Sequence, residues 1–325
     1  MAAVEQRARP RASGDGSRAA PSEASLGSGG SMSPGPTATT QPHLLLATLM
    51  HRYARGAEAM AWSGGIVELM GELGFSEAAT RMALSRLVRR GVLVPAKQGR
   101  RVFYVLDADA RETLDRAANR AASVAAGGAR PASWTVLWHH GPAESSRERG
   151  RLGRRLRPLG FGTLRTGVWI AAHDRAREAA ELLDELDLAG TVSAVVGPGL
   201  AGLAPQPEEI WDFDGLDARY RAFDREFAKP ARALREARSD GRAALVLSVR
   251  ADAAFRELAA ADPGLPVEMA GGRPAARAGA ASCAAIIEEQ LRATAQWHFN
   301  ELSSSWMNAT QRRSPSADSP SKQRS

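Results

Sequence analysis

The apolar positions near the start of the ordered-looking sequence predict two amphipathic helices. In the first stretch, large apolar side chains recur at helical spacing, at Leu45, Leu46, Leu49, Met50 and Tyr53. After Trp62 the same spacing recurs at Ile66, Leu69, Met70 and Leu73. Gly74 is expected to end the second helix, because glycine tolerates the backbone conformation that commonly follows a helix.

A third helix and a β-hairpin are predicted directly afterwards. Ser76 is a suitable N-cap for a helix over residues 76–90. Two β-rich runs follow at residues 92–94 and 101–106, and Lys97-Gln98-Gly99 between them predicts a hairpin turn.

The next part of the chain alternates strands and helices in another order. A helix rich in Ala and Arg is predicted over residues 109–126, and it leads to Gly127-Gly128-Ala129-Arg130-Pro131. Strands are predicted at residues 134–139, 160–164, 167–172 and 191–196. Helices are predicted at residues 143–159 and 174–188. The order βαββαβ is that of the ferredoxin-like arrangement.

Beyond Pro207 the pattern is helical, and both ends of the chain are polar. Helices are predicted over residues 216–236 and 242–261, with a less regular end rich in Ala and Gly around residues 270–285. The first 42 residues and residues 303–325 carry few large apolar side chains. Such segments bury too little apolar surface to offset the entropy of ordering, so we expect disordered tails.

The third predicted helix has one apolar face and one basic face when its residues are spaced about 100° apart. The apolar side holds Thr80, Ala83, Leu84 and Leu87, with Val88 near its margin. The opposite side holds Arg81, Met82, Ser85, Arg86 and Arg89. The hairpin adds three basic residues near its tip, Lys97, Arg100 and Arg101.

A basic helix followed by a basic hairpin is typical of a winged helix-turn-helix that binds duplex DNA. Within residues 43–106, nine Lys and Arg stand against four Glu, a net charge of +5 that lies almost wholly in the last two elements. Arginine forks match guanine edges, and short polar or apolar side chains fit the rest of the major groove. The alternative is a solvated basic helix beside an ordinary hairpin.

Composition narrows the class without deciding it. The chain has 43 Lys and Arg against 36 Asp and Glu and a pI near 10.4, which favours a polyanionic partner such as nucleic acid or a membrane surface. Cys283 is the single cysteine, so no intrachain disulfide forms, and a cytoplasmic location is expected. No run approaches the roughly 20 apolar residues of a membrane span, so no membrane partner is expected.

The sequence resembles the PaaX family of transcriptional repressors. The resemblance is carried by AWSGGIVELMGELGFSEAATRMALSRLVRRGVLV and GRRVFYVL, and continues through SWTVLWHH and RLRPLGFGTLRTGVWIAAH. It covers most of residues 43–202. It implies a middle domain similar to the small ferredoxin-like nuclease of CRISPR adaptation, a helical third domain and a homodimer. Carried onto this chain, the family's arginine-bearing motif places Arg81 and Arg86 at DNA, with Arg100 and Arg101 in the wing.

The resemblance also implies a ligand response, and one segment departs from the family. Family members respond to an acyl-CoA, typically phenylacetyl-CoA, that binds outside the DNA-reading domain; no other cofactor and no metal is expected. DPGLPVEM resembles the family's DPxLP segment, but AGGRPAARAGAASCAA replaces the tryptophan- and arginine-containing stretch expected after it. An effector pocket or dimer contacts that depend on this segment would be altered. Trp169 is expected in the core, with a share in binding an aromatic effector as the alternative.

We therefore predict a multidomain α+β transcription regulator, a repressor of an aromatic-acid catabolic operon, and not an enzyme. The expected segments are a disordered tail (1–42), a winged helix-turn-helix (43–108), a helical connector (109–131), a ferredoxin-like domain (132–202), a helical domain (203–302) and a second tail (303–325). Two other classes stay open: a metal-dependent nuclease on the ferredoxin-like domain, and a non-specific nucleic-acid binder that uses the basic tails.

Several further motifs are weaker. Residues 197–202 spell G-x-G-x-x-G, but the prolines after it prevent the helix that a dinucleotide site requires. The resembling nuclease carries a metal-binding aspartate near His139-His140, and imidazoles without nearby carboxylates suit magnesium poorly. Two acidic groups, one at Asp184, Glu185 and Asp187 and one at Asp212, Asp214 and Asp217, are expected to be solvated or to cap helices.

Overall fold

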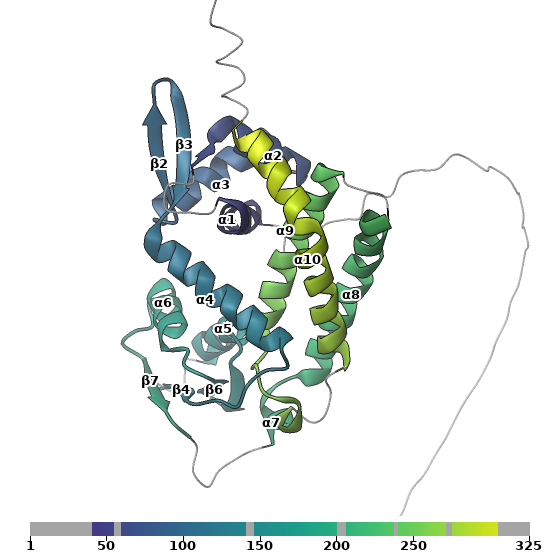
Figure 1. Cartoon of the computed structure of the whole chain (residues 1–325). Coiled ribbons are helices and arrows are strands. Elements are labelled where there is room, and N and C mark those ends of the chain that lie inside the picture. Colours follow the sequence, from purple (N-terminus) through teal and green to yellow (C-terminus); the bar gives the residue numbers. More distant parts are fainter. Residues whose placement is uncertain are drawn as a thin grey trace, which may run out of the picture. The chain divides into compact units, whose positions relative to one another are not determined.

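The computed structural model describes residues 41–54, 60–140, 146–199, 206–236, 240–270 and 275–304. Within them the fold is mixed helix and sheet, with two separate antiparallel sheets (Figure 1). Of the two expected disordered tails, residues 1–40 and 305–325 lie outside the described residues.

The first part contains three helices and a small sheet. The helices are α1 (Pro42–Tyr53), α2 (Ser63–Glu72) and α3 (Glu77–Arg89). The strands β1 (Ala61–Trp62), β2 (Leu93–Gln98) and β3 (Arg101–Leu106) pair in the order β1-β3-β2. Ser76 is the N-cap of α3, because its Oγ accepts a hydrogen bond from the amide of Ala79 at 3.2 Å. Gly74 has a φ of 90°, as expected after a helix.

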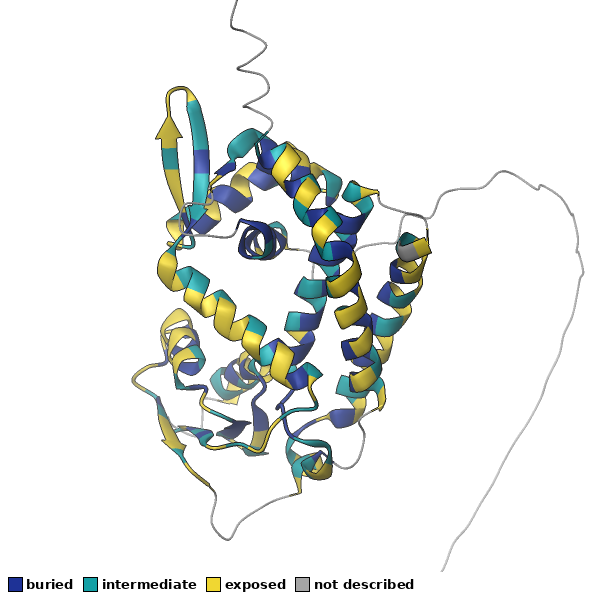
Figure 2. Cartoon of the chain, in the orientation of Figure 1, coloured by how far each residue is buried: buried dark blue, intermediate teal, exposed yellow. Residues whose placement is uncertain are grey.

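The hairpin turn is shorter than the sequence predicts. Lys97 and Gln98 belong to β2, and Gln98 pairs with Arg101, so the turn consists of Gly99 and Arg100. Gly99 has a φ of 60°, which two-residue hairpin turns of the primed type require. The prediction was wrong here because β2 is largely exposed and lacks the alternation of apolar side chains that marks a strand (Figure 2).

A long helix leads to the second sheet. It is α4 (Ala108–Ala125), and Asp107 caps its start by accepting from the amide of Asp109 at 3.0 Å. The second sheet and its helices follow the predicted order of elements. Their bounds are β4 (Trp134–His139), α5 (Ser146–Leu156), η1 (Arg157–Leu159), β5 (Gly162–Arg165), β6 (Val168–Ala172), α6 (Ala176–Leu186) and β7 (Val192–Gly197).

The four strands of the second sheet lie in the order β5-β6-β4-β7, and the sheet is covered differently on its two faces. On one face Leu137 and Trp169 pack with apolar residues of α5 and α6. On the other face Ile170 packs with Trp211 and Leu265 from the last third of the chain. Trp169, 4% exposed, is therefore a core residue of the helix-covered face.

The last third is helical, and its end is more regular than the sequence predicts. Its helices are α7 (Pro207–Ile210), α8 (Phe213–Glu236), α9 (Gly241–Ala261), η2 (Val267–Met269) and α10 (Ala275–Ser303). Most of the stretch expected to be irregular is the start of α10, which runs for 29 residues. Alanine has the highest helix propensity, and Cys283, Ile287 and Leu291 of α10 are buried against neighbouring helices.

The first three helices and the last three long helices share one hydrophobic core. The contact is close, because a Cβ atom on Gly65 of α2 would collide with the carbonyl oxygen of Leu302 in α10. Polar contacts add to it: Arg250 of α9 donates to the carbonyl oxygen of Leu73 at 3.0 Å, and His298 of α10 lies 2.9 Å from Glu72. Helix α3 is thus supported by the C-terminal helices as well as by its own neighbours.

Candidate nucleic-acid interface

Helix α3 turns its apolar face inward and its basic face to solvent, as the sequence predicts. Thr80, Ala83, Leu84 and Leu87 are buried. The exposed residues are Arg81, Met82, Ser85, Arg86 and Arg89. Met82 is 67% exposed, which is unusual for a large apolar side chain on a helix that packs against a core. An exposed methionine between arginines provides an apolar contact surface beside the charges.

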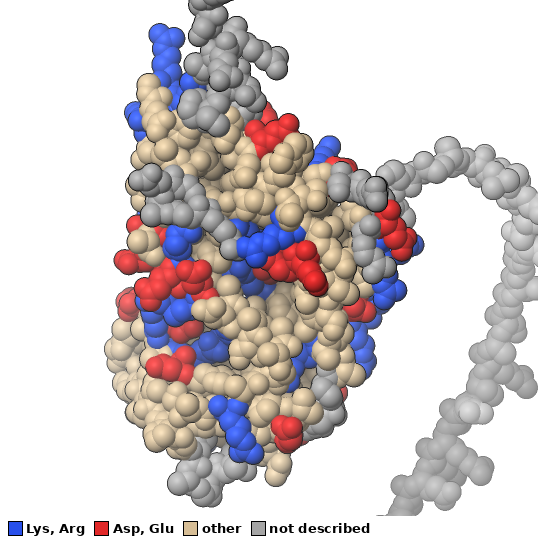
Figure 3. Space-filling model, in the orientation of Figure 1, with Lys and Arg blue, Asp and Glu red and all other residues tan. Residues whose placement is uncertain are grey.

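The hairpin places a second basic group beside α3. Lys97 and Arg100 are exposed, whereas Arg101 is partly buried. Figure 3 shows basic side chains at the tip of this hairpin. The β2–β3 hairpin and α3 are consecutive elements, and α3 contacts β2 directly. The exposed charges of both elements therefore belong to one part of the surface.

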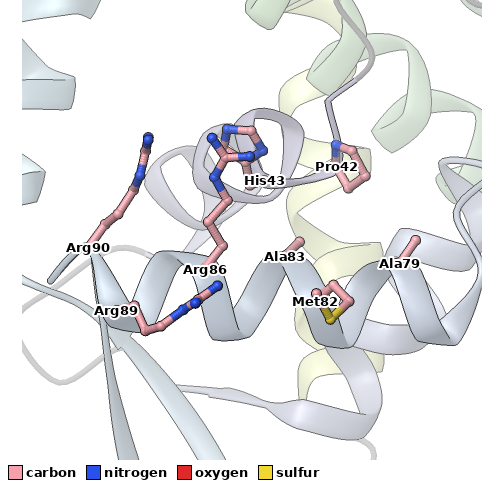
Figure 4. Close-up of a pocket in the computed structure, with 8 residues that line it drawn as sticks. All are labelled: Pro42, His43, Ala79, Met82, Ala83, Arg86, Arg89 and Arg90. Atoms are coloured by element: carbon pink, nitrogen blue, oxygen red, sulfur yellow. The ribbon is translucent and has the colours of Figure 1, made fainter. Parts of the chain in front are cut away.

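A hollow of about 550 Å³ lies along one flank of α3, where the helix meets the start of α1 (Figure 4). It is lined by Pro42, His43, Ala79, Met82, Ala83, Arg86, Arg89 and Arg90. In Figure 4 the side chain of Arg86 extends toward His43. Burial lowers the pKa of His43, and the positive charges of Arg86 and Arg90 lower it further. The hollow is therefore strongly electropositive even with a neutral imidazole.

A second hollow, of about 620 Å³, lies along the other flank of α3, between α2 and β3. Its lining residues from these elements are Trp62, Ser63, Gly64, Val67, Glu68, Glu77, Arg81, Leu84, Ser85, Val102 and Tyr104. Arg81 and Ser85 thus face one hollow, whereas Met82, Arg86 and Arg89 face the other. The exposed face of α3 forms a ridge between two depressions.

Each hollow also contains the start of a helix that lacks a side-chain cap. Helix α1 begins at Pro42, and its N-cap residue Gln41 makes no capping side-chain hydrogen bond. Helix α2 begins at Ser63, and its N-cap residue Trp62 makes none either. Amide groups at a helix start carry partial positive charge and bind phosphate oxygens readily. The two hollows therefore combine arginines with helix starts that favour anions.

The arginines of α3 differ in their partners. Arg81 donates from Nε to Glu77 at 2.8 Å in an i,i+4 pair whose side chains are both more than half exposed. Such a pair contributes only about 0–1 kcal/mol and is easily exchanged for another anion. Within the described residues, Arg86 and Arg89 have no carboxylate partner. These two guanidinium groups are the ones most available to a polyanion.

Two residues of this surface were missed by sequence reasoning. His43 and Arg90 line the first hollow beside the expected Arg86 and Arg89. The paired arginines at 89 and 90 were a signal for Arg90, because both follow the basic face toward the helix end. No signal in the sequence indicated His43, since its position depends on how α1 packs against α3.

The weaker motifs take structural positions. A carboxylate does lie near the paired histidines, contrary to the expectation: His139 Nε2 is 3.2 Å from Glu148 Oε2, because α5 packs back over the end of β4. Asp212 accepts from the amide of Gly215 at 2.8 Å and so caps a helix start. Burial raises the pKa of Cys283 to about 11. The G-x-G-x-x-G segment lies partly outside the described residues.

The described residues include no group of three or more His, Cys, Asp or Glu arranged to hold a metal ion. Among the described helices, none combines the length and the apolar character that crossing a bilayer requires.

Fold and surface together define a multidomain α+β protein with a basic helix and hairpin at one end of the chain sequence. Three models of one family match it in order: the PaaX-like protein over residues 42–110, the PaaX protein central Cas2-like domain over residues 130–208, and the PaaX-like protein C-terminal domain over residues 211–301. The chain belongs to the PaaX family.

Individual relatives were found among curated proteins and solved structures. The chain is 29% identical over 222 residues to the transcriptional repressor PaaX of Escherichia coli (strain K12), a match that covers 66% of this chain and 69% of that protein. It is also similar to the uncharacterized protein Rv0674 from Mycobacterium tuberculosis, with 22% identity and a TM-score of 0.42 over 79% of this chain and 99% of that chain.

Proposed function

We propose that this protein is a transcription regulator of the repressor class that binds duplex DNA through α3 and the β2–β3 hairpin, as a winged helix-turn-helix. One observation carries the proposal. The exposed face of α3 is a basic ridge between two hollows, and each hollow contains a helix start without a side-chain cap. A ridge of this kind fits the major groove, and the flanking anion-binding hollows fit the phosphate backbones on its two sides.

The side chains divide into two roles in this arrangement. Arg86 and Arg81 are placed to reach guanine edges, with Ser85 and Met82 contacting the remaining base edges. Arg89, Arg90 and the starts of α1 and α2 would hold phosphates, which fixes the position of α3 along the duplex. Lys97, Arg100 and Arg101 of the hairpin would contact the backbone or the minor groove beyond the ends of α3.

The middle domain is assigned to the ferredoxin-like arrangement, and its role to assembly. The antiparallel order β5-β6-β4-β7 supports the assignment, and so does the family's central Cas2-like domain. Membership of a family with a transcriptional repressor favours a regulator over a nuclease. The His139–Glu148 pair does not change this, because magnesium prefers several oxygen ligands.

Two further elements of the proposal come from the family. The protein would act as a homodimer, whose two copies of α3 meet half-sites separated by about one helical turn or a multiple of it. An acyl-CoA, phenylacetyl-CoA in the first instance, would lower DNA affinity by binding more tightly to the form that does not bind DNA. Coupling of this kind is usually about 1–3 kcal/mol.

The proposal is tested by selecting a binding sequence from a random duplex library and measuring affinities by fluorescence anisotropy in magnesium. We expect tight binding to the selected duplex and no cleavage of it. Removing residues 1–40 and 305–325 should change the affinity little. The double variant Arg86→Ala/Arg89→Ala should lose most of it, whereas Arg177→Ala, an exposed arginine on α6, should not.

Each rival class has a distinct outcome in the same experiment. Cleavage that requires a divalent ion would indicate a nuclease. Loss of binding after removal of the tails, with no effect of the α3 variants, would indicate a non-specific binder.

A further inference from the structure

A cavity of about 420 Å³ lies between α1, α4, α9 and α10, away from the basic surface; we call it the inter-helix cavity. Eight of its lining residues are alanines, at positions 118, 121, 122, 125, 251, 281, 284 and 285. Small side chains on three facing helices leave space that larger apolar residues would fill. Ala122 and Ala285 are exposed, so the cavity opens at the surface.

Ser248 of α9 gives this cavity one polar group in its depth. The residue is 0% exposed and lines the cavity, and its hydroxyl has no hydrogen-bond partner within the described residues. A buried hydroxyl without a partner is costly, and native proteins seldom keep one. A serine in this position therefore points to a ligand group, or a water, that bonds to Oγ.

The charged residues of the cavity are already paired with one another. Arg52 of α1 lies 3.2 Å from Asp252 of α9 and also pairs with Glu288 of α10. Arg256 Nε donates to Asp252 at 2.8 Å. These ion pairs join the first helix of the chain to α9 and α10.

His51 extends this network to α4. Arg256 Nη2 lies 3.2 Å from Nδ1 of His51, and Nε2 of His51 lies 2.9 Å from Asp115. Nδ1 therefore accepts and Nε2 donates, which requires a neutral imidazole. Burial lowers the pKa of His51, in agreement with this tautomer. Two arginines then face three carboxylates, so the cavity has an excess of negative charge.

We propose that the inter-helix cavity is the effector site of this regulator and binds a compact apolar acyl group, aromatic or aliphatic, through a neutral ester, thioester or amide carbonyl that accepts from Ser248 Oγ. The proposal rests on the function proposed above. The alanine lining favours an apolar group, and the volume is within the range of small-ligand pockets. The excess of carboxylates disfavours the corresponding free acid, because its anion would be repelled.

The position of the cavity explains how its ligand would reach the DNA-binding surface. Helix α1 supplies His51 and Arg52 to the cavity, and the same helix packs directly on α3. The start of α1 also forms part of the hollow that holds Arg86. A group that enters between α4 and α10 must displace some of these ion pairs. A shift of α1 would then alter the hollow beside α3.

The test is to block the cavity from its open side. Phenylacetyl-CoA, phenylacetate and coenzyme A serve as probes, and binding is measured by calorimetry on the full chain. The variant Ala122→Phe fills the cavity from α4. Ala117→Phe is the matched control, because Ala117 is exposed on the same helix and does not line the cavity.

We expect the wild type and Ala117→Phe to bind phenylacetyl-CoA, and neither to bind phenylacetate or coenzyme A comparably. Ala122→Phe should lose at least about tenfold in affinity for phenylacetyl-CoA. Ser248→Ala should lose severalfold and should leave the temperature of unfolding unchanged or higher, because it removes an unpaired buried hydroxyl. Equal binding by Ala122→Phe and Ala117→Phe would overturn the proposal, and so would a wild type that binds none of the probes or prefers phenylacetate.

The DNA affinity of each variant without any probe separates this inference from the proposed function. Ala122→Phe and Ala117→Phe should both bind DNA as the wild type does. A wild type that binds the thioester but no duplex would remove the regulator while leaving the cavity a ligand site.

Discussion

Arginine serves opposite purposes in two regions of this molecule. On the α3 surface, Arg86 and Arg89 are exposed and have no carboxylate partner within the described residues. At the inter-helix cavity, the side chain of Arg52 is only 10% exposed and is paired with Asp252 and Glu288. An exposed, unpaired guanidinium group is available to phosphate, whereas a buried and paired one holds helices together. Residue type alone does not separate the two roles.

The largest expected effect tests the buried side of this comparison. Arg52→Ala should destabilise the protein by about 2–4 kcal/mol, less than a fully buried pair because Glu288 is partly solvated. Two carboxylates lose their partner, and the joint between α1 and α9 is weakened. Urea unfolding followed by circular dichroism measures the change. The matched control is Arg177→Ala on α6, whose exposed pair with Glu181 should contribute no more than about 1 kcal/mol. Similar losses for both variants would contradict a structural role specific to Arg52.

The exposed side is tested by replacing Arg86. Arg86→Ala should weaken binding to a selected duplex by about 1–3 kcal/mol and relax its sequence preference, because a base-reading fork is removed. Its stability should stay near that of the wild type. Arg81→Ala is expected to have an effect in the same direction, with the Glu77 pair removed as well. Competition anisotropy against random duplex measures the preference. An equal loss on both kinds of DNA would assign these side chains to phosphates only.

The hairpin is tested through salt dependence. Neutralising Arg100 and Arg101 together should flatten the slope of log affinity against log salt by about 0.9 for each phosphate that the hairpin no longer neutralises. Arg116→Ala combined with Arg177→Ala removes two charges from α4 and α6 and serves as the control. Anisotropy titrations over a range of salt concentrations measure the slope. An unchanged slope in the hairpin variant would exclude the hairpin from the interface.

The smallest effect concerns pH. The pKa of His43 is lowered in the free protein by burial and by Arg86 and Arg90, so the side chain is neutral at pH 7. A phosphate bound in the hollow would raise this pKa, and DNA binding would then take up a proton. Affinity should rise as pH falls from about 7.5 to 6, by no more than about tenfold for one pKa unit. Stability should move oppositely, because a histidine with a lowered folded-state pKa destabilises the fold as pH falls below its unfolded value of 6.5.

Replacing His43 isolates this effect. His43→Gln should abolish the added affinity at low pH while leaving binding at pH 8 nearly unchanged. His51 keeps its own lowered pKa in this variant, so a pH dependence that persists would belong to His51 or another group.

Local periodicity was sufficient for much of the fold. The spacing of Thr80, Ala83, Leu84 and Leu87 predicted the buried face of α3, since a helix of 3.6 residues per turn places them on one side. The predicted strand at Trp134–His139 is confirmed to the residue. The prediction was wrong where side chains carry little local signal. Exposed β2 lacks alternation, and the start of α10 consists mostly of Ala and Gly, which only packing against α8 and α9 makes regular.

The sequence by itself determined which residues form the basic face of α3 and in which order the strands and helices follow, because both depend on neighbours within a few residues. Only the tertiary structure decided that α1 joins α9 and α10 in one core, that His43 lies beside Arg86, and that eight alanines surround Ser248. These features bring together residues that are far apart in the chain. Their energies depend on burial and on charge pairing, which no local pattern in the chain records.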